Sequence, residues 1–201
     1  MLRPAAARRA TIVHPNGAAR ENRMPRYLLA IDVGTLSARA GVFDEAGGLV
    51  GAASAGFALY RPAEHHAVYR MAEIWAAVTE AVRGCLAERP AIAAAVAGIA
   101  FDATASLALA HTGAKPLDGD ADVICWMDHR AEAEAAAAAA TGDRALAYVG
   151  GTLSPEFQLP KLLWLKRRRP DFISYRRAAY CHYQRNFHAA GQSRALLGLF
   201  V

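Results

Sequence analysis

AIDVGTLSARAGVFD, residues 30–44, is the stretch that decides the fold. In it an apolar strand ends in Asp32 and turns at once through Gly34, Thr35 and Ser37 into a second apolar stretch. A carboxylate at a strand end can hold Mg²⁺, directly or through water. Glycine and small hydroxyl residues let backbone N–H groups approach a phosphate closely. The pattern therefore predicts a β-hairpin that combines a cation ligand with a cradle for an anion.

This turn has the spacing of neither common nucleotide-binding loop. It lacks the Walker A pattern GxxxxGK[ST] and the GxGxxG of dinucleotide-binding folds. A tight hairpin whose Asp32 and Thr35 only satisfy turn hydrogen bonds would show the same local pattern. The rest of the chain has to separate these two interpretations.

Outward from the hairpin, the chain continues with alternating strand and helix patterns. The run LVGAASAGFALY predicts a third strand, and AVAGIAFD, SLALA and DVICW predict further buried strands. The segment EIWAAVTEAVRGCL has apolar residues at helical spacing, so its apolar face is expected to pack on the sheet, and Pro90 follows it as a stop. The segments predict an α/β domain.

Two more helices are predicted in the second half of the chain. HRAEAEAAAAAA is rich in the residue with the best helix propensity, and Thr141 and Gly142 close it. PKLLWLKRRR begins with Pro160, where a missing N–H costs little, and stops before Pro170.

The net charge of +5 is unevenly distributed along the sequence. Residues 1–26 carry +5 and residues 166–201 carry +7, whereas residues 27–165 carry −7. Binding to nucleic acid needs a clustered basic face on the fold, so this distribution argues against a nucleic-acid partner. A basic DNA-binding protein, suggested by the pI of about 9.4, is the weaker alternative.

The lengths of the apolar runs and the number and spacing of the cysteines exclude further classes of protein. No run approaches the ~20 apolar residues of a membrane span, so no membrane association is expected. Cys85, Cys125 and Cys181 are an odd number without a CxxC pair, which argues against disulfides or zinc and favours a reducing, cytoplasmic location.

The two ends differ in character from the acidic middle. Residues 1–23 form a basic extension, interpreted as sequence upstream of a start at Met24 or as a targeting peptide. Residues 24–170 form the domain. Residues 171–201 have no clean period, and one Cys and two His there are too few for a metal site.

Four ordered segments resemble one known family. The pattern Asp-x-Gly-Thr-x-Ser-x-Arg resembles the first phosphate loop of the actin-like ATPase superfamily. Together with GIAFDATASLAL, VICWMDHRAEAEA and GGTLSPEFQLPKLLWLKRRRP, it resembles the FGGY carbohydrate kinases, in particular the ribulokinase-like pentulose kinases, over residues 27–170. The resemblance implies an α/β actin-like ATPase (ribonuclease H-like) fold, present as a partial first domain with a mixed β-sheet and flanking helices.

The resemblance also implies roles for the residues of the hairpin. Asp32 is expected near the γ-phosphate of ATP as a ligand of Mg²⁺. Gly34, Thr35 and Ser37 are expected to line the phosphate loop, and Arg39 to lie on the outgoing strand.

Other residues are implied to border a sugar. Asp102, Thr104 and Ala105 lie in the stretch that borders the sugar pocket in this family, with a turn former as the alternative for Asp102. Lys161 resembles a lysine that contacts substrate hydroxyls, with a solvated lysine on the first turn of a helix as its alternative. Asp128 is expected to be a hinge or cap residue.

The implied activity is ATP-dependent phosphorylation of a carbohydrate hydroxyl, on a pentulose such as D-ribulose or L-ribulose. The catalytic base of the family is an Asp in a Gly-Asp-(Gln/Asn) element, which does not occur after residue 170. Relatives are more than twice as long and are expected to form homo-oligomers. We therefore expect a truncated or frameshifted chain that is inactive by itself.

The alternative to a kinase is another member of the actin-like superfamily. A chaperone-type ATPase or a sugar-binding regulatory protein would share the phosphate loop. The stretches FDATASLAL and WMDHRA, which the sugar kinases share, argue for a sugar kinase.

Overall fold

The structure, a computed structural model, describes residues 26–109, 117–169 and 180–181. The predicted basic extension and nearly all of the predicted divergent tail, with its two histidines, lie outside the described residues. The boundaries predicted at residues 23 and 170 therefore stay predictions.

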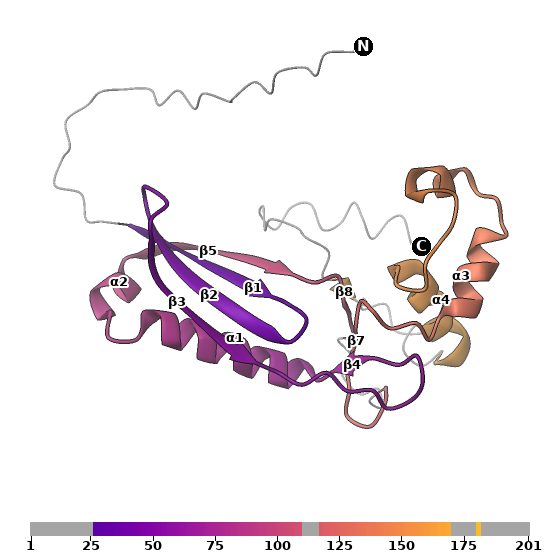
Figure 1. The fold of residues 1–201 in the computed structure, drawn as a ribbon, viewed down its shortest axis with the longest axis horizontal. Helices are drawn as coiled ribbons and strands as arrows, with labels where there is room; N and C mark the ends of the chain where they lie inside the picture. Colours follow the sequence, from indigo (N-terminus) through magenta and orange to yellow (C-terminus); the bar gives the residue numbers. More distant parts are fainter. Residues whose placement is uncertain (1–25, 110–116, 170–179, 182–201) are drawn as a thin grey trace, which may run out of the picture.

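The predicted hairpin forms the centre of a large four-stranded sheet with the order β3-β2-β1-β5 (Figure 1). Its strands are β1 (Tyr27–Val33), β2 (Ser37–Asp44), β3 (Leu49–Gly56) and β5 (Val96–Ala103). The first three strands pair antiparallel, and β5 pairs parallel to β1. The sheet is mixed, as predicted.

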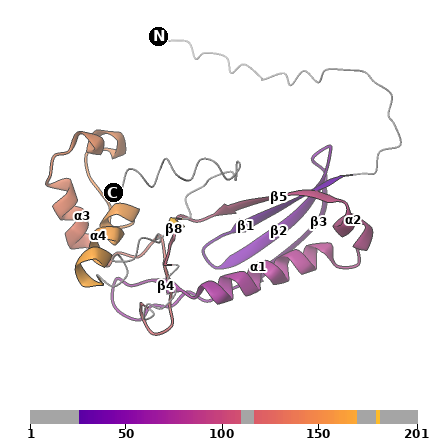
Figure 2. The ribbon, with the colours of Figure 1, turned by 180° about the vertical axis from the view of Figure 1, so that it is seen from behind.

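Helix α1 (Met71–Leu86) covers one face of the large sheet, as Figures 1 and 2 show from opposite sides. Side chains alternate along the strands, so Leu29 and Ile31 of β1 and Val42 of β2 face the helix and are buried. They form one core with Val78 and other residues of α1. The predicted packing of this helix on the sheet is confirmed.

Two glycines allow α1 to lie very close to β3. A Cβ atom on Gly84 would lie 2.8 Å from the Cβ of Ala53, and one on Gly51 would lie 2.6 Å from the carbonyl oxygen of Cys85. Real side chains do not approach so closely, so both positions require glycine. The helix is thereby fixed against the strand that flanks the hairpin.

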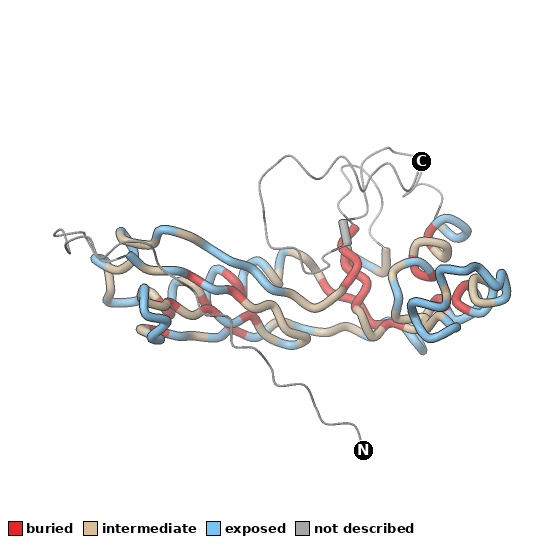
Figure 3. Tube along the Cα trace, turned by 90° about the horizontal axis from the view of Figure 1, so that it is seen from above, coloured by how far each residue is buried: buried red, intermediate tan, exposed pale blue. Residues whose placement is uncertain are grey.

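A small four-stranded sheet follows, with the order β4-β7-β6-β8 and antiparallel pairs. It consists of β4 (Val68–Tyr69), β7 (Val123–Ile124), β6 (Leu107–Ala108) and β8 (Tyr180–Cys181). Beyond it lie the 3₁₀ helix η1 (Arg144–Val149), α3 (Glu132–Ala139) and α4 (Gln158–Arg168), of which α3 contacts α4. The short helix α2 (Pro90–Ala94) lies at the opposite end, and buried residues run from the large sheet into this second region (Figure 3).

Several predicted boundaries were wrong for local reasons. Helix α4 begins at Gln158 rather than Pro160, because the first four N–H groups of a helix have no intrahelical partner and a proline fits anywhere among them. Helix α3 begins only at Glu132, with Ala131 as its N-cap, and the N–H of His129 before it is bonded to the carbonyl of His65. Pro90 does not only stop α1 but starts α2.

The second face of the large sheet and the outer edge of β5 have no covering element among the described residues. On the second face Leu28 is 56% exposed and Leu49 61%, and on the edge strand β5 Ile99 is 60% exposed. Apolar surface of this kind and an unpaired strand edge favour association with further protein.

Candidate functional site

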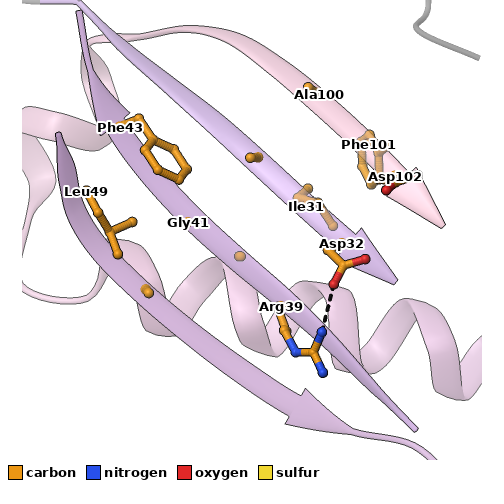
Figure 4. Close-up of a pocket in the computed structure, with 12 residues that line it drawn as sticks. Ile31, Asp32, Arg39, Gly41, Phe43, Leu49, Ala100, Phe101 and Asp102 are labelled. Atoms are coloured by element: carbon orange, nitrogen blue, oxygen red, sulfur yellow. Dashed lines mark hydrogen bonds and ion pairs between the residues drawn. The ribbon is translucent and has the colours of Figure 1, made fainter. Parts of the chain in front are cut away.

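The sheet brings three charged side chains into one row across neighbouring strands. Asp32 of β1 is in register with Arg39 of β2 on one side and with Asp102 of β5 on the other. Registered neighbours project to the same face of a sheet, and Figure 4 shows the three on the face opposite α1. The row lies near the carboxyl ends of β1 and β5, where the hairpin turn begins.

Asp32 and Arg39 form an ion pair across the hairpin. The Arg39 guanidinium donates to Oδ2 of Asp32 at 2.9 Å, and the side chains are 64% and 47% exposed, respectively. An exposed pair of this kind contributes only about 0–1 kcal/mol to stability. The donor to Asp32 is thus a side chain on the next strand rather than a backbone group of the turn, and the roles expected of Asp32 at the phosphate and the metal stay predictions.

Asp102 stays within the strand rather than forming a turn. Its Oδ1 accepts a hydrogen bond from the N–H of Ala103 at 2.9 Å. Its second carboxylate oxygen is open to the same face as Asp32. The alternative of a mere turn former for Asp102 does not fit this position.

An open cavity of about 780 Å³ lies over the row. Its floor consists of small and apolar residues of all four strands (Figure 4). The lining residues on this face are Ala30, Gly41, Phe43, Leu49, Ala52 and Ala100, together with the three charged residues. The arrangement is a charged rim beside a flat apolar floor.

The turn between β1 and β2 provides backbone donors beside the row. The N–H of Gly34 bonds to the carbonyl of Ser37 at 2.9 Å, which closes the turn. Within the described part of the chain, nothing accepts from the N–H of Thr35 or of Leu36. These two N–H groups are adjacent in the turn and are free to donate to a phosphate oxygen.

Thr35 is contacted by two aromatic residues that the sequence analysis did not single out. The indole Nε1 of Trp126 donates to Oγ1 of Thr35 at 3.1 Å, and the hydroxyl of Tyr69 donates to its carbonyl at 2.9 Å. Trp126 belongs to a stretch that carried the family resemblance, so a signal for it was present. The position of Tyr69 follows only from the tertiary fold.

The predicted sugar-bordering segment is tied to both halves of the fold. The N–H of Thr104 bonds to the carbonyl of Val33 at 3.0 Å, which continues the β1–β5 pairing past Asp102. The side-chain amide of Gln158 donates to the carbonyl of Ala105, so the start of α4 lies against this segment. The structure thus brings Asp102, Thr104 and Ala105 next to the hairpin.

Lys161 is fully buried, so its alternative as a solvated lysine was wrong. Its ammonium donates to the carbonyls of Cys125 at 2.8 Å, Trp126 at 2.7 Å and Glu156 at 3.0 Å. Burial lowers the pKa of Lys161 to about 8. All three hydrogens of the ammonium are used within the protein, so a substrate hydroxyl would have to replace one of these carbonyls.

Asp128 has a structural position but does not cap a helix, because the N-cap of α3 is Ala131 and no side chain caps that helix. It is fully buried and accepts from the N–H of Ala67 at 2.6 Å and from the Arg130 guanidinium at 2.8 Å. Arg130 also contacts Asp118 at 3.0 Å and lies over the ring of Trp164. These contacts hold the loop between β7 and α3 and leave Asp128 without an oxygen for a ligand.

Asp32 and Asp102 fit a Mg²⁺ ion that is also bound by phosphates. Among the described residues there is no group of three or more His, Cys, Asp or Glu that could hold a metal by itself. Mg²⁺ in phosphate-handling sites is usually bound by one or two carboxylates, by substrate phosphates and by water. Two exposed carboxylates in register beside unpaired N–H groups match that donor set.

None of the described helices is both long enough and apolar enough to cross a membrane.

The sequence matches the profile of the FGGY family of carbohydrate kinases, N-terminal domain, over residues 27–182, which extends past the boundary predicted at residue 170. An FGGY carbohydrate kinase domain-containing protein of Danio rerio is 38% identical over 151 residues, 72% of this chain and 27% of that protein. A D-ribulokinase of Saccharomyces cerevisiae is 36% identical over 149 residues, 70% of this chain and 21% of that protein. The chain thus spans about a quarter of the length of these relatives.

Solved structures of sugar kinases share the fold. A xylulose kinase from Brucella ovis superposes with a TM-score of 0.64 at 27% identity, covering 74% of this chain and 31% of that chain. A glycerol kinase from Plasmodium falciparum, solved with ADP, superposes with a TM-score of 0.54 at 17% identity, over 75% of this chain and 30% of that chain. The predicted actin-like ATPase fold with a partial mixed-sheet domain is confirmed.

Proposed function

The chain belongs to the FGGY family of carbohydrate kinases, and from that premise we propose that it carries the phosphate-binding hairpin and part of the sugar site of a kinase that transfers a phosphoryl group from ATP to a pentulose, D-ribulose or L-ribulose. The row of Arg39, Asp32 and Asp102 beside the turn carries the proposal. It supports the proposal because two carboxylates suited to a cation and backbone N–H groups suited to a phosphate lie within one hairpin and its parallel neighbour.

In this proposal the two carboxylates of the row bind the cation, and the turn binds the phosphate oxygens. Asp32 and Asp102 would hold Mg²⁺, which when bound neutralises charge on the phosphates. The N–H groups of Thr35 and Leu36 donate to phosphate oxygens. The exposed guanidinium of Arg39, which is paired with Asp32, is a further donor to these oxygens. Positioning and electrostatic stabilisation of this kind account for most of the catalysis of phosphoryl transfer.

The sugar would lie on the side of β5 and α4. Residues 102–105 form the end of β5 and the stretch directly after it, next to the turn, and Lys161 holds the carbonyls of Cys125 and Trp126 behind them. The D-ribulokinase among the relatives supports a ketopentose as substrate. A glycerol kinase of Rhodospirillum centenum, 32% identical over 142 residues, supports glycerol as the second candidate.

We propose that the 201-residue polypeptide by itself is inactive. Transfer to a sugar hydroxyl needs a base for its proton, and the two carboxylates on the open face are assigned to the metal. The face above them is also open to water, which weakens every electrostatic interaction there. Cys85 and Cys125, both buried and free, support a reducing compartment such as the cytoplasm.

The substrate can be tested with a chimera of the yeast D-ribulokinase. The segment of that enzyme matching residues 27–169 is replaced by this chain's segment, and ADP formation is measured with D-ribulose, L-ribulose, D-xylulose and glycerol. We expect the highest kcat/KM with a ribulose. Glycerol as the best substrate would favour the second candidate, and ATP hydrolysis that no sugar or polyol stimulates would point to a non-kinase ATPase.

A further inference from the structure

Thr35 is fixed at two of its atoms by residues of the small sheet and the loop after it. The indole N–H of Trp126 bonds to its hydroxyl oxygen at 3.1 Å, and the Tyr69 hydroxyl bonds to its carbonyl at 2.9 Å. Tyr69 ends β4, and Trp126 follows β7, the strand that pairs with β4. The tip of the hairpin is thus held by residues far from it in the sequence.

The direction of each hydrogen bond around Tyr69 follows from its single hydroxyl hydrogen. That hydrogen goes to the carbonyl of Thr35, so the contact of 3.1 Å with Sγ of Cys125 has the thiol as donor. Burial raises the pKa of Tyr69. The tyrosine therefore keeps its hydrogen and stays a donor to Thr35 at physiological pH.

The bond from Trp126 decides what the Thr35 hydroxyl can do. An indole N–H can only donate, so the Thr35 oxygen accepts. The hydroxyl hydrogen of Thr35 is then left to donate elsewhere, and no acceptor for it lies within the described residues. A hydroxyl that accepts one hydrogen bond is also a stronger donor in the next.

We propose that Trp126 and Tyr69 are positioning residues for the phosphate site: they hold Thr35 so that its hydroxyl donates to a phosphate oxygen, beside the unpaired N–H groups of Thr35 and Leu36. The inference rests on the proposed function. Three donors are then available to one anion: the hydroxyl and the N–H of Thr35, and the N–H of Leu36.

Cys125 and Trp126 connect the phosphate turn to Lys161. The ammonium of Lys161 bonds to the carbonyls of Cys125 and Trp126, the residues that contact Tyr69 and Thr35 through their side chains. The N–H of Trp126 is in turn held by the hydroxyl of Ser106 at 3.2 Å, next to the sugar-bordering segment. A continuous set of hydrogen bonds thus runs from α4 to the turn.

The test uses the full 201-residue chain, labelled with ¹⁵N in its tryptophans. It is compared with four variants: Thr35→Val, Thr35→Ser, Trp126→Phe, and the double variant that combines Thr35→Val with Trp126→Phe. Circular dichroism melting checks that each is folded. The indole N–H resonances of Trp75, Trp126 and Trp164 are recorded, first without ligand and then during titration with Mg²⁺ and inorganic tripolyphosphate. Tripolyphosphate presents the phosphate chain without the rest of the nucleotide.

We expect Thr35→Val to shift the indole resonance of Trp126 and to leave those of Trp75 and Trp164 in place, whereas Thr35→Ser leaves all three in place. Thr35→Val and Trp126→Phe each weaken tripolyphosphate binding by about 5-fold, the loss of one hydrogen bond. The double variant loses no more than the single ones, because both remove the same oriented hydroxyl.

Three results would overturn the inference. An unmoved Trp126 resonance in Thr35→Val would show that the two side chains do not interact. Wild-type binding of tripolyphosphate by Thr35→Val would remove the donor role of Thr35 alone. Failure of the folded wild-type chain to bind Mg²⁺ with tripolyphosphate would overturn the proposed function together with the inference.

Discussion

Replacing Lys161 by methionine tests how strongly the buried ammonium holds the site together. The ammonium donates to three backbone carbonyls, those of Cys125, Trp126 and Glu156, and is fully buried. Methionine has similar length and no hydrogen to donate, so the three carbonyls lose their common partner. The loop carrying Trp126 then loses its hydrogen bonds to α4 and keeps the contact of Arg130 with the ring of Trp164.

The expected loss follows from these contacts. A hydrogen bond to a charged group contributes about 1.5–3 kcal/mol, and removal of the desolvation penalty of the ammonium offsets part of the sum of three. Breaking a buried charged cluster by removing one partner typically costs about 3–5 kcal/mol. We therefore expect Lys161→Met to lower the free energy of unfolding by about 3 kcal/mol, a large share of the total for one domain.

The measurement is urea unfolding at pH 7, followed by tryptophan fluorescence. Lys166→Met is the matched control, because it changes the same residue type on the exposed side of the same helix, and it should stay within about 0.5 kcal/mol of the wild type. A loss below about 1 kcal/mol in Lys161→Met, or one equal to that of the control, would show that the buried ammonium does not stabilise the fold.

The pH dependence of stability, compared between the wild type and Lys161→Met, provides a second readout. Burial lowers the pKa of Lys161 from 10.5 to about 8. Between these values the unfolded chain binds a proton that the folded chain has released, so the stability of the wild type rises with pH relative to Lys161→Met, by about 3 kcal/mol across the window. A difference between the two proteins that does not change from pH 7 to 10 would contradict the lowered pKa.

Two further predictions concern the large sheet. Gly51→Ala should lower the free energy of unfolding by about 2 kcal/mol in a urea titration, because its Cβ would lie 2.6 Å from a backbone oxygen of α1. The control Ala52→Val, on the open face, should stay within about 0.5 kcal/mol of the wild type. Equal losses in the two variants would contradict the close packing of α1 on β3. Leu28→Glu with Leu49→Glu should reduce aggregation in light scattering at nearly unchanged stability, because both side chains are more than half exposed. Leu29→Glu, which places the charge in the core, should unfold the chain, and aggregation of the surface variant equal to that of the wild type would contradict the role of the open face.

Much of the large sheet could be predicted from the sequence because its signals are local. The hairpin with Asp32, Gly34 and Thr35, the helix packed on it and the parallel strand ending in Asp102 all follow from apolar periodicity and turn residues. What the sequence pattern alone could not give is the register that sets Asp32 beside Asp102. That register depends on pairing between strands separated by α1.

The small sheet and the contacts around Thr35 could not be predicted in the same way. Its strands are only two residues long, too short for any period, so Tyr69 and Trp126 gave no sign that they meet at the turn. Lys161 was misjudged as a possible surface residue because a lysine in the first turn of a helix is usually solvated. Only the loop that folds back over it supplies the carbonyls that bury it.

Asp32 provides the most direct test of the central claim that this hairpin handles the phosphates of a sugar kinase. In the chimera with the yeast D-ribulokinase, Asp32→Asn is compared with Glu45→Gln, an exposed carboxylate at the other end of the same hairpin. We expect Asp32→Asn to lower kcat for ribulose-dependent ADP formation by about 100-fold or more, with unchanged thermal unfolding, and Glu45→Gln to retain full activity. Equal activity of the two variants would contradict that claim.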